Sequence, residues 1–161
     1  MCAKAYFKKP GKSDLVLREL SKLPYQFVLL RNVFISLQWP VTYQKTTESV
    51  KSCQIDYVVI GPSGIFIIEA KNWDEITFKE KTPHEEVDKA GLIMYIKLNR
   101  YFTKKIPIYN IVATIKHGSL IRYGFVHQLS VWQLTNFIYS QDSNISKAEI
   151  RKIRRLHMSN K

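Results

Sequence analysis

The central run of the chain, residues 54–71, consists of two apolar segments joined by a turn sequence. It reads QIDYVVIGPSGIFIIEAK, and its four residues Gly61-Pro62-Ser63-Gly64 are a strong turn signal. A loop of two or four residues centred there gives a single antiparallel register, in which the numbers of paired residues add up to 125. The run therefore predicts a β-hairpin, and its register predicts which side chains lie opposite each other.

Ionisable residues lie at the open end of this hairpin. In the expected register Asp56 lies directly opposite Glu69, with Cβ atoms about 4.5–5.5 Å apart. Lys71 follows Glu69 by two residues and so shares its face of the strand. Two carboxylates this close raise one pKa unless a cation lies between them. The arrangement therefore indicates either a site for a hard divalent ion such as Mg²⁺, with Lys71 stabilising charge on a phosphate, or a structural Glu–Lys pair at the sheet edge.

Basic residues outnumber acidic residues in the chain. Its 161 residues include 25 Lys and Arg against 13 Asp and Glu, a net charge of +12. Such a charge favours polyanionic partners through a phosphate attraction that salt weakens. Because 45% of the residues are hydrophobic, the chain should fold as one globular domain. Nucleic acid is the leading candidate for the partner, and a generally basic, soluble surface is the alternative.

The cysteines and the hydropathy pattern bear on where the protein works. Cys2 and Cys53 are too few for a disulfide framework or a zinc cluster, which indicates free thiols in a reducing cytoplasm. No apolar stretch approaches the roughly 20 residues that span a bilayer, and the first residues lack a signal-peptide core. We therefore expect a cytoplasmic protein without a membrane partner.

Hydrophobic periodicity predicts further elements on both sides of the hairpin. Helices are expected over residues 13–23, 83–102 and 131–139, strands over 27–37, 73–81, 106–115 and 121–126, and a polar loop or edge segment over 42–53. The tryptophans are expected in the core, and the histidines in loops or on the surface. The organisation expected is a basic N-terminal arm (1–12), one domain (11–139) and a basic C-terminal helix (140–161).

The C-terminal helix has a clear start signal and a strongly basic face. Ser146 and Glu149 have the spacing of a capping box, and Ile145 and Ile150 that of a hydrophobic staple. Apolar residues at positions 150, 153 and 156 can dock one face of the helix on the domain. We expect the outward residues to bind nucleic-acid phosphates, and a solvated face or mobile tail is the alternative; the residues concerned are Arg151, Lys152, Arg154 and Arg155.

The order helix, three strands, helix, strand is similar to the αβββαβ core of the PD-(D/E)xK nucleases. This is a restriction-endonuclease-like α/β fold with a central mixed sheet flanked by helices. Locally the chain resembles one branch of that superfamily, the nuclease-related domain (NERD). The resemblance covers about residues 11–139 and rests on Gly11–Asp14 with Leu20 and Leu23, on Gln54–Asp56, Gly61–Phe66 and Ile68–Asn72, and more weakly on 106–107 and 131–138.

The resemblance implies a metal-dependent phosphodiesterase site. It makes Asp56 and Glu69 metal ligands, assisted by the Ala70 carbonyl, and it makes Lys71 the catalytic lysine. Gln54, two residues before Asp56, would orient a water or a phosphate, and a plain surface residue is the alternative there.

Two further positions depart from the family pattern. Asp14 occupies the place where the family usually has Glu on its first helix, and an ordinary helix-start acid competes with a metal-binding role. The second helix of the family usually carries Gln, which has no match in this sequence; Glu86, Asp88 and Lys89 are the nearby candidates.

On these grounds we expect a deoxyribonuclease that hydrolyses phosphodiester bonds with a metal-activated water and uses Mg²⁺ or Mn²⁺. The complete set of Asp, Glu and Lys favours this reading. The alternatives are a non-catalytic nucleic-acid-binding module with a degenerate nuclease fold, and an ion-pair cluster in a protein that binds another macromolecule through its basic surface. The sequence leaves open RNA as a substrate, strand state, end or internal cleavage, and oligomeric state, a dimer included.

Overall fold

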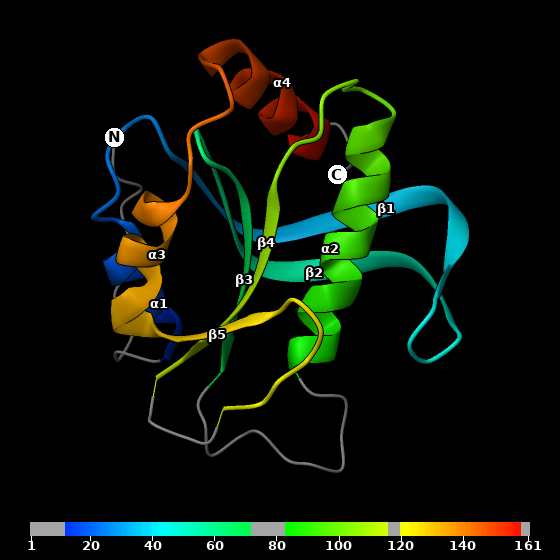
Figure 1. Cartoon of the computed structure of the whole chain (residues 1–161), viewed down its shortest axis with the longest axis horizontal. Helices are drawn as coiled ribbons and strands as arrows, with labels where there is room; N and C mark the ends of the chain where they lie inside the picture. The colour runs from blue at the N-terminus through cyan, green and yellow to red at the C-terminus, as the bar shows by residue number, and fades with distance from the viewer. Residues whose placement is uncertain (1–11, 72–82, 116–119, 159–161) are drawn as a thin grey trace.

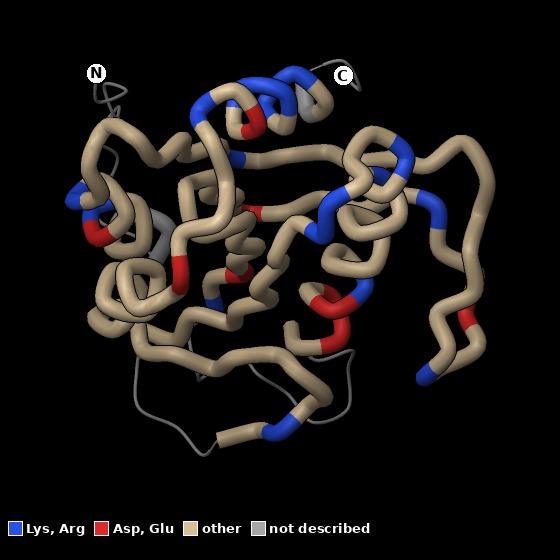
Figure 2. Tube along the Cα trace, turned by 45° about the horizontal axis from the view of Figure 1, so that its top comes forward, with Lys and Arg blue, Asp and Glu red and all other residues tan. Residues whose placement is uncertain are grey.

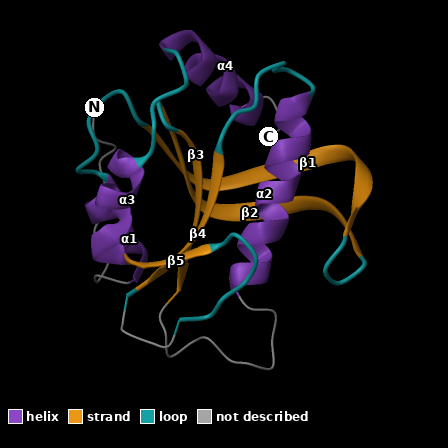
Figure 3. Cartoon of the chain, viewed as in Figure 1, coloured by secondary structure: helices purple, strands orange, loops and turns teal. Residues whose placement is uncertain are grey.

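A mixed β-sheet runs through the middle of the molecule, with helices on both faces (Figures 1 and 3). The structure is a computed structural model, and it describes residues 12–71, 83–115 and 120–158. Within these ranges the sheet has five strands in the order β1-β2-β3-β4-β5; β1 to β3 pair antiparallel, whereas β3–β4 and β4–β5 are parallel. The strands are β1 (Val28–Tyr43), β2 (Glu48–Gly61), β3 (Gly64–Lys71), β4 (Ile108–Thr114) and β5 (His127–Ser130).

The helices complete the expected order of elements. They are α1 (Lys12–Leu20), α2 (Pro83–Asn99), α3 (Leu134–Ser140) and α4 (Lys147–Met158), with a 3₁₀ turn, η2 (Val131–Gln133), before α3. The chain order α1, β1–β3, α2, β4 is the αβββαβ order, so the predicted α/β fold with a central mixed sheet flanked by helices is confirmed.

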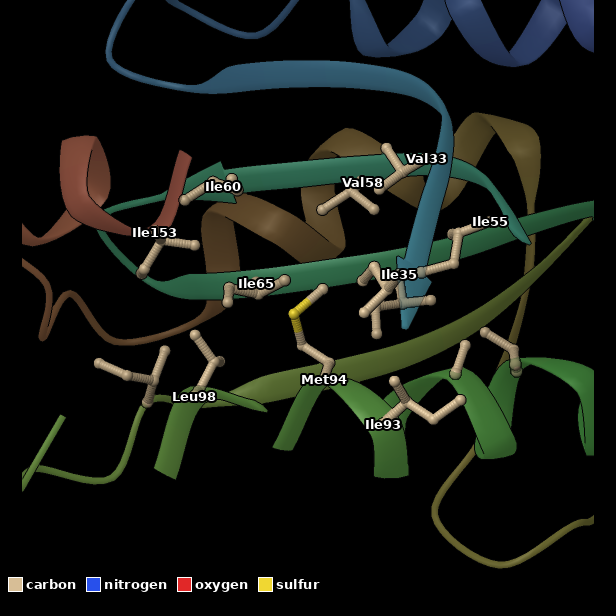
Figure 4. Close-up of a cluster of buried hydrophobic side chains, with 14 of the residues drawn as sticks. Val33, Ile35, Ile55, Val58, Ile60, Ile65, Ile93, Met94, Leu98 and Ile153 are labelled. Atoms are coloured by element: carbon tan, nitrogen blue, oxygen red, sulfur yellow. The ribbon is translucent and has the colours of Figure 1, made fainter. Parts of the chain in front are cut away.

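Two hydrophobic cores hold the helices to the sheet. On one face, α2 and α4 pack through residues such as Met94, Leu98 and Ile153 against Ile60 and Ile65 (Figure 4). On the other face, α1 and α3 pack against β3, through the buried residues Val16, Leu20, Phe66, Ile68, Leu134 and Ile138. The middle strands are therefore apolar on both faces, which explains the unbroken hydrophobic runs of the central hairpin.

Strands β1 and β2 form a long hairpin, because residues 42–53, expected as a polar loop or edge segment, belong mostly to these two strands. Val41 pairs with Val50 and Tyr43 with Glu48, and Tyr43 is buried. Between them, Thr42 and Ser49 pair and are exposed. The polar composition thus reflects one solvent-facing side of a two-stranded ribbon, and the expected loop is reduced to the tip.

The last strand of the sheet differs from the expected one. Residues 121–126 form no strand; Gly124 has a φ of 51°, and Phe125 is 93% exposed. The strand is instead β5, His127–Ser130, which pairs with residues 111–114 of β4. The short strand predicted over 73–81 lies outside the described residues.

The start of α4 confirms the predicted capping box. The Ser146 amide donates to Glu149 Oε1 at 3.0 Å, and the Glu149 amide donates to Ser146 Oγ at 3.1 Å. Ile145 and Ile150 are both buried in the core that α2 shares, as the expected staple requires. In the described part of the chain, no helix is long and apolar enough to cross a membrane.

Candidate active site

The register of the central hairpin is the one that the turn sequence predicts. Its pairs run from Gly61 opposite Gly64 to Tyr57 opposite Ile68. The next residues along the two strands are Asp56 and Glu69. Pairing of β2 with β3 ends here, whereas β2 stays paired with β1 as far as Glu48 and β3 stays paired with β4 as far as Lys71. In Figure 1 the β1–β2 hairpin extends to one side of the sheet. The two carboxylates therefore lie where the two halves of the sheet diverge.

The Asp56 side chain bridges the diverging strands. Its Oδ2 accepts a hydrogen bond from the Ala70 amide at 3.1 Å. This charge-assisted bond satisfies a backbone donor at the point where strand pairing ends, and it fixes the carboxylate beside Glu69. In its protonated form Glu69 can also hydrogen-bond to Asp56, which further raises the pKa of Glu69.

The strands change face at this position. Val58 packs in the core beneath α2, and so does Ile55, although residues three apart on a regular strand point to opposite faces. Asn32, between the β1 residues that pair with Tyr57 and Ile55, has a φ of 50°, a conformation that Asn tolerates better than most residues. The alternation of both strands is thus interrupted at Asp56.

This interruption bears on Gln54. The side chain is exposed and its residue pairs with Phe34, which is also exposed, whereas the adjacent Ile55 is buried. The structure gives Gln54 no contact with Asp56 or Glu69. Its role in orienting a water or a phosphate stays a prediction.

The environment of Glu69 disfavours its charged form. Burial raises the pKa of Glu69 to about 7, and the negative charge of Asp56 adds to the shift, while Lys71 acts in the opposite direction. Lys71 Nζ lies 3.8 Å from Glu69 Oε1. The structure therefore brings Asp56, Glu69 and Lys71 together, as predicted from the hairpin, and places the Ala70 amide beside Asp56.

The start of α2 adds a third carboxylate to this electrostatic environment. The charge of Glu86 raises the pKa of Glu69, and after burial it is the main cause that raises the pKa of Cys53 to about 12. Glu86 is one of the three nearby candidates on the second helix, and no definite role was expected for it. Its position in the first turn of a helix that opens with Pro83 is the signal that could have identified it.

The other two candidates on α2, Asp88 and Lys89, contact the β1–β2 hairpin through their side chains. Asp88 Oδ2 accepts hydrogen bonds from Tyr43 Oη at 2.6 Å and Lys45 Nζ at 2.9 Å. Lys89 is buried, and its Nζ donates to Glu48 Oε2 at 2.5 Å. Both residues thus tie α2 to the tip of the β1–β2 hairpin.

Asp14 lies within α1, but its side chain falls outside the described residues, so its metal-binding role stays a prediction.

His84 contradicts the expectation of a loop or surface histidine. It is fully buried, and its Nε2 lies 2.9 Å from Gln128 Oε1. It secures the start of α2 against β5.

The donor set of the site fits a hard divalent ion. Mg²⁺ is commonly held by one or two carboxylates together with waters and phosphate oxygens, and Asp56 and Glu69 supply those carboxylates. Within the described residues there is no cluster of three or more His, Cys, Asp or Glu that could hold a metal ion. A cation would also relieve the repulsion that raises the pKa of Glu69.

Comparison with known proteins gives one match. A family model described as the nuclease-related domain matches residues 11–117, which include α1, the hairpin and α2. Neither the curated proteins nor the solved structures gave a match.

Proposed function

Because the chain belongs to the nuclease-related domain family, we propose that it is a Mg²⁺- or Mn²⁺-dependent nuclease that hydrolyses the phosphodiester bonds of DNA. The observation that carries the proposal is the pair of carboxylates at the divergence of β2 and β3, with a lysine on the same strand as Glu69. The family match supports a nuclease-related function, and the donor chemistry of the pair supports a metal-dependent one.

The residues of the site take distinct roles in this proposal. Asp56 and Glu69 hold the metal, with the Ala70 carbonyl as a third oxygen donor. When bound, the metal supplies a water of lowered pKa and polarises the phosphodiester. Asp56 is held in place by the Ala70 amide, so the site is positioned by backbone as well as by side chains.

Lys71 provides the only positive charge assigned to the reacting centre. Its Nζ lies 3.8 Å from Glu69 Oε1, so both side chains can lie beside the same substrate phosphate. A positioned cation stabilises the charge that develops on the phosphate in the transition state. Glu86 increases the negative potential at the pair and so favours a cation there.

A cleavage assay tests the proposed function. Supercoiled plasmid, linear duplex and single-stranded DNA are each incubated with the purified chain in Mg²⁺, in Mn²⁺ and in EDTA. We expect cleavage of at least one substrate in the presence of metal and none in EDTA. Asp56→Asn, which keeps a hydrogen-bond acceptor for the Ala70 amide but loses the charge, should be inactive and also controls for a contaminating nuclease.

DNA binding without cleavage would contradict the proposal. If the chain binds DNA but cleaves none of the three substrates in either metal, the proposed activity is wrong. The alternative of a non-catalytic nucleic-acid-binding module would then take its place.

A further inference from the structure

A cluster of basic residues lies at one end of the molecule. Figure 2 shows Lys and Arg along α4, and the end of α2 with the loop after it carries more of them. These two segments, 97–105 and 147–156, are the basic end. Nine of the 25 Lys and Arg of the chain belong to it, with Glu149 as its one acidic residue: Lys97, Arg100, Lys104, Lys105, Lys147, Arg151, Lys152, Arg154 and Arg155.

Direct contacts join the two segments of the basic end. Lys152 Nζ donates to the Tyr101 carbonyl at 2.8 Å and lies 4.6 Å from the centre of the Phe102 ring. Lys104 Nζ donates to the Asn144 carbonyl and lies 3.0 Å from Glu149 Oε1. The segments therefore form one continuous surface, in which Lys104 and Lys152 serve the packing.

The remaining charges of α4 face solvent. Lys147, Arg151, Arg154 and Arg155 are exposed, and the structure gives them no partner among the residues it describes. The apolar face of the helix is occupied, because Ile150 and Ile153 are buried against the sheet. A helix docked in this way cannot insert its apolar face into a lipid bilayer, so the surface is suited to a polyanion that binds by charge.

A pocket within the basic end has the character of an anion site. It has a volume of about 160 Å³, lies between β1 and the end of α2, and is lined by Ser36, Leu37, Gln38, Lys97, Arg100 and Tyr101. Lys97 Nζ donates to the Ser36 carbonyl at 2.9 Å. Burial, and then the charge of Arg100, lower the pKa of Lys97. An anion seated here would relieve the repulsion between these two cations.

The catalytic end, which is the part of the molecule around Asp56 and Glu69, has no excess of positive charge. Six carboxylates lie on the β1–β2 hairpin, β3 and the first half of α2, namely Glu48, Asp56, Glu69, Glu85, Glu86 and Asp88, and the same elements carry five basic residues, Arg31, Lys45, Lys51, Lys71 and Lys89. Three of these lysines lie within 4 Å of one of the carboxylates. The basic end is therefore the better source of the attraction that brings a polyanion to the protein.

The lengths of β3 and α2 give the distance between the basic end and the catalytic end. The segment before α4 is held to the β2–β3 turn, where the Pro62 carbonyl accepts the Asn144 amide at 2.8 Å. From Gly64 to the residues Glu69–Lys71, β3 spans roughly 16–23 Å at about 3.3 Å per residue. Along α2, the fourteen steps from Glu86 to Arg100 span roughly 21 Å at about 1.5 Å per residue. A nucleic-acid strand with phosphates about 3.4 Å apart along the helix axis needs about six nucleotides to cover this distance.

We propose that the basic end is a nucleic-acid anchor remote from the catalytic end, so that the protein acts efficiently only on strands long enough to reach both. The inference rests on the proposed nuclease function for its cleavage component. The anchor itself is a binding surface and does not depend on catalysis. The partner is a nucleic-acid backbone, recognised through its phosphates without base-specific contacts.

Binding measured in EDTA tests the anchor without cleavage. The probe is a fluorescent 30-base-pair duplex, and the variant carries Arg151→Gln, Arg154→Gln and Arg155→Gln. A matched control with the same loss of charge carries Arg18→Gln, Lys51→Gln and Arg122→Gln, all exposed and outside the basic end. We expect the anchor variant to make the slope of log affinity against log salt shallower by roughly 2–3, because each phosphate contact contributes about 0.7–0.9. The control variant should change the slope much less.

Substrate length supplies the second measurement. Against a long duplex with Mg²⁺, the anchor variant should lose kcat/KM at low salt in proportion to its loss of affinity. Against a trinucleotide, which is too short to reach the basic end, both triple variants should match the wild type.

Three results would overturn the inference. They are an equal change of slope in both triple variants, an unchanged slope in the anchor variant, and an equal loss of kcat/KM on short and long substrates. Retained duplex affinity with lost binding to phosphatidylserine vesicles would assign the surface to anionic lipid instead. If no variant cleaves DNA but the slopes differ as expected, the nuclease proposal fails while the anchor stands.

Discussion

Replacing Lys71 with Ala should lower the rate of DNA cleavage by about 10²–10³-fold while leaving DNA affinity almost unchanged. The loss of one positioned charge at a transition state typically has an effect of this size. Affinity, by contrast, depends on a charge distribution to which Lys71 contributes one of 25 Lys and Arg. Single-turnover cleavage with Mg²⁺ and a gel-shift titration in EDTA measure the two quantities separately.

Lys51→Ala is the matched control for Lys71. It removes the same charge from an exposed position on β2 and should leave turnover close to that of the wild type. If turnover and affinity fell together in Lys71→Ala, or if neither changed, Lys71 would not be the catalytic lysine.

Replacing Glu69 with Gln should abolish cleavage and yet stabilise the metal-free protein at high pH. The pKa of Glu69 is raised to about 7, so the folded state holds a proton that the unfolded state releases above about pH 4.5. Titration of Glu69 therefore lowers the free energy of unfolding of the wild type as the pH rises from about 4.5 to 7. Above about pH 7 this group contributes no further change. The side chain is only 16% exposed, so the full shift is worth about 2–3 kcal/mol after some allowance for screening.

Urea unfolding in EDTA at pH 4.5, 6 and 8 measures this effect. The advantage of Glu69→Gln over the wild type should be small at pH 4.5 and largest at pH 8. Glu149→Gln is the control with the opposite sign, because hydrogen bonds from Ser146 and Lys104 lower the pKa of Glu149. That variant should lose stability relative to the wild type above about pH 4.5. A Glu69→Gln protein that is less stable than the wild type at pH 8 would show that Glu69 is a structural ion-pair partner of Lys71.

The parts of the fold that could be predicted depend on local signals. The turn residues set the hairpin register, so the proximity of Asp56 and Glu69 followed from the sequence. The start of α4 was also predictable, because the capping box of Ser146 and Glu149 involves residues only three apart. Such signals need no knowledge of the rest of the fold.

Other features depend on contacts between distant segments. The face change at Asp56 involves β1 as well as β2, since Asn32 has a positive φ at the matching position. β5 has only four residues, and its place is set by pairing with β4. No local pattern indicates either feature.

The tryptophans show the same limit. Trp39 is 72% exposed and Trp132 58% exposed, against the expectation that they belong to the core, and Trp73 lies outside the described residues. A bulky residue in a short apolar segment can point to either side, and only packing decides. For Trp132, the adjacent Val131 is the residue that is buried.

The central claim is that Asp56 and Glu69 together hold a divalent metal, and isothermal titration of Mg²⁺ into the wild type, Asp56→Ala and Asp142→Ala tests it most directly. We expect one Mg²⁺ site in the wild type. Because Glu69 must lose its proton to bind the metal, the Mg²⁺ affinity should rise as the pH increases through about 7. The number of protons released on binding should fall over the same range. Asp56→Ala should show no binding, while Asp142→Ala, which removes an exposed carboxylate before α4, should bind as the wild type does. Equal Mg²⁺ affinity in the wild type and Asp56→Ala would contradict the account.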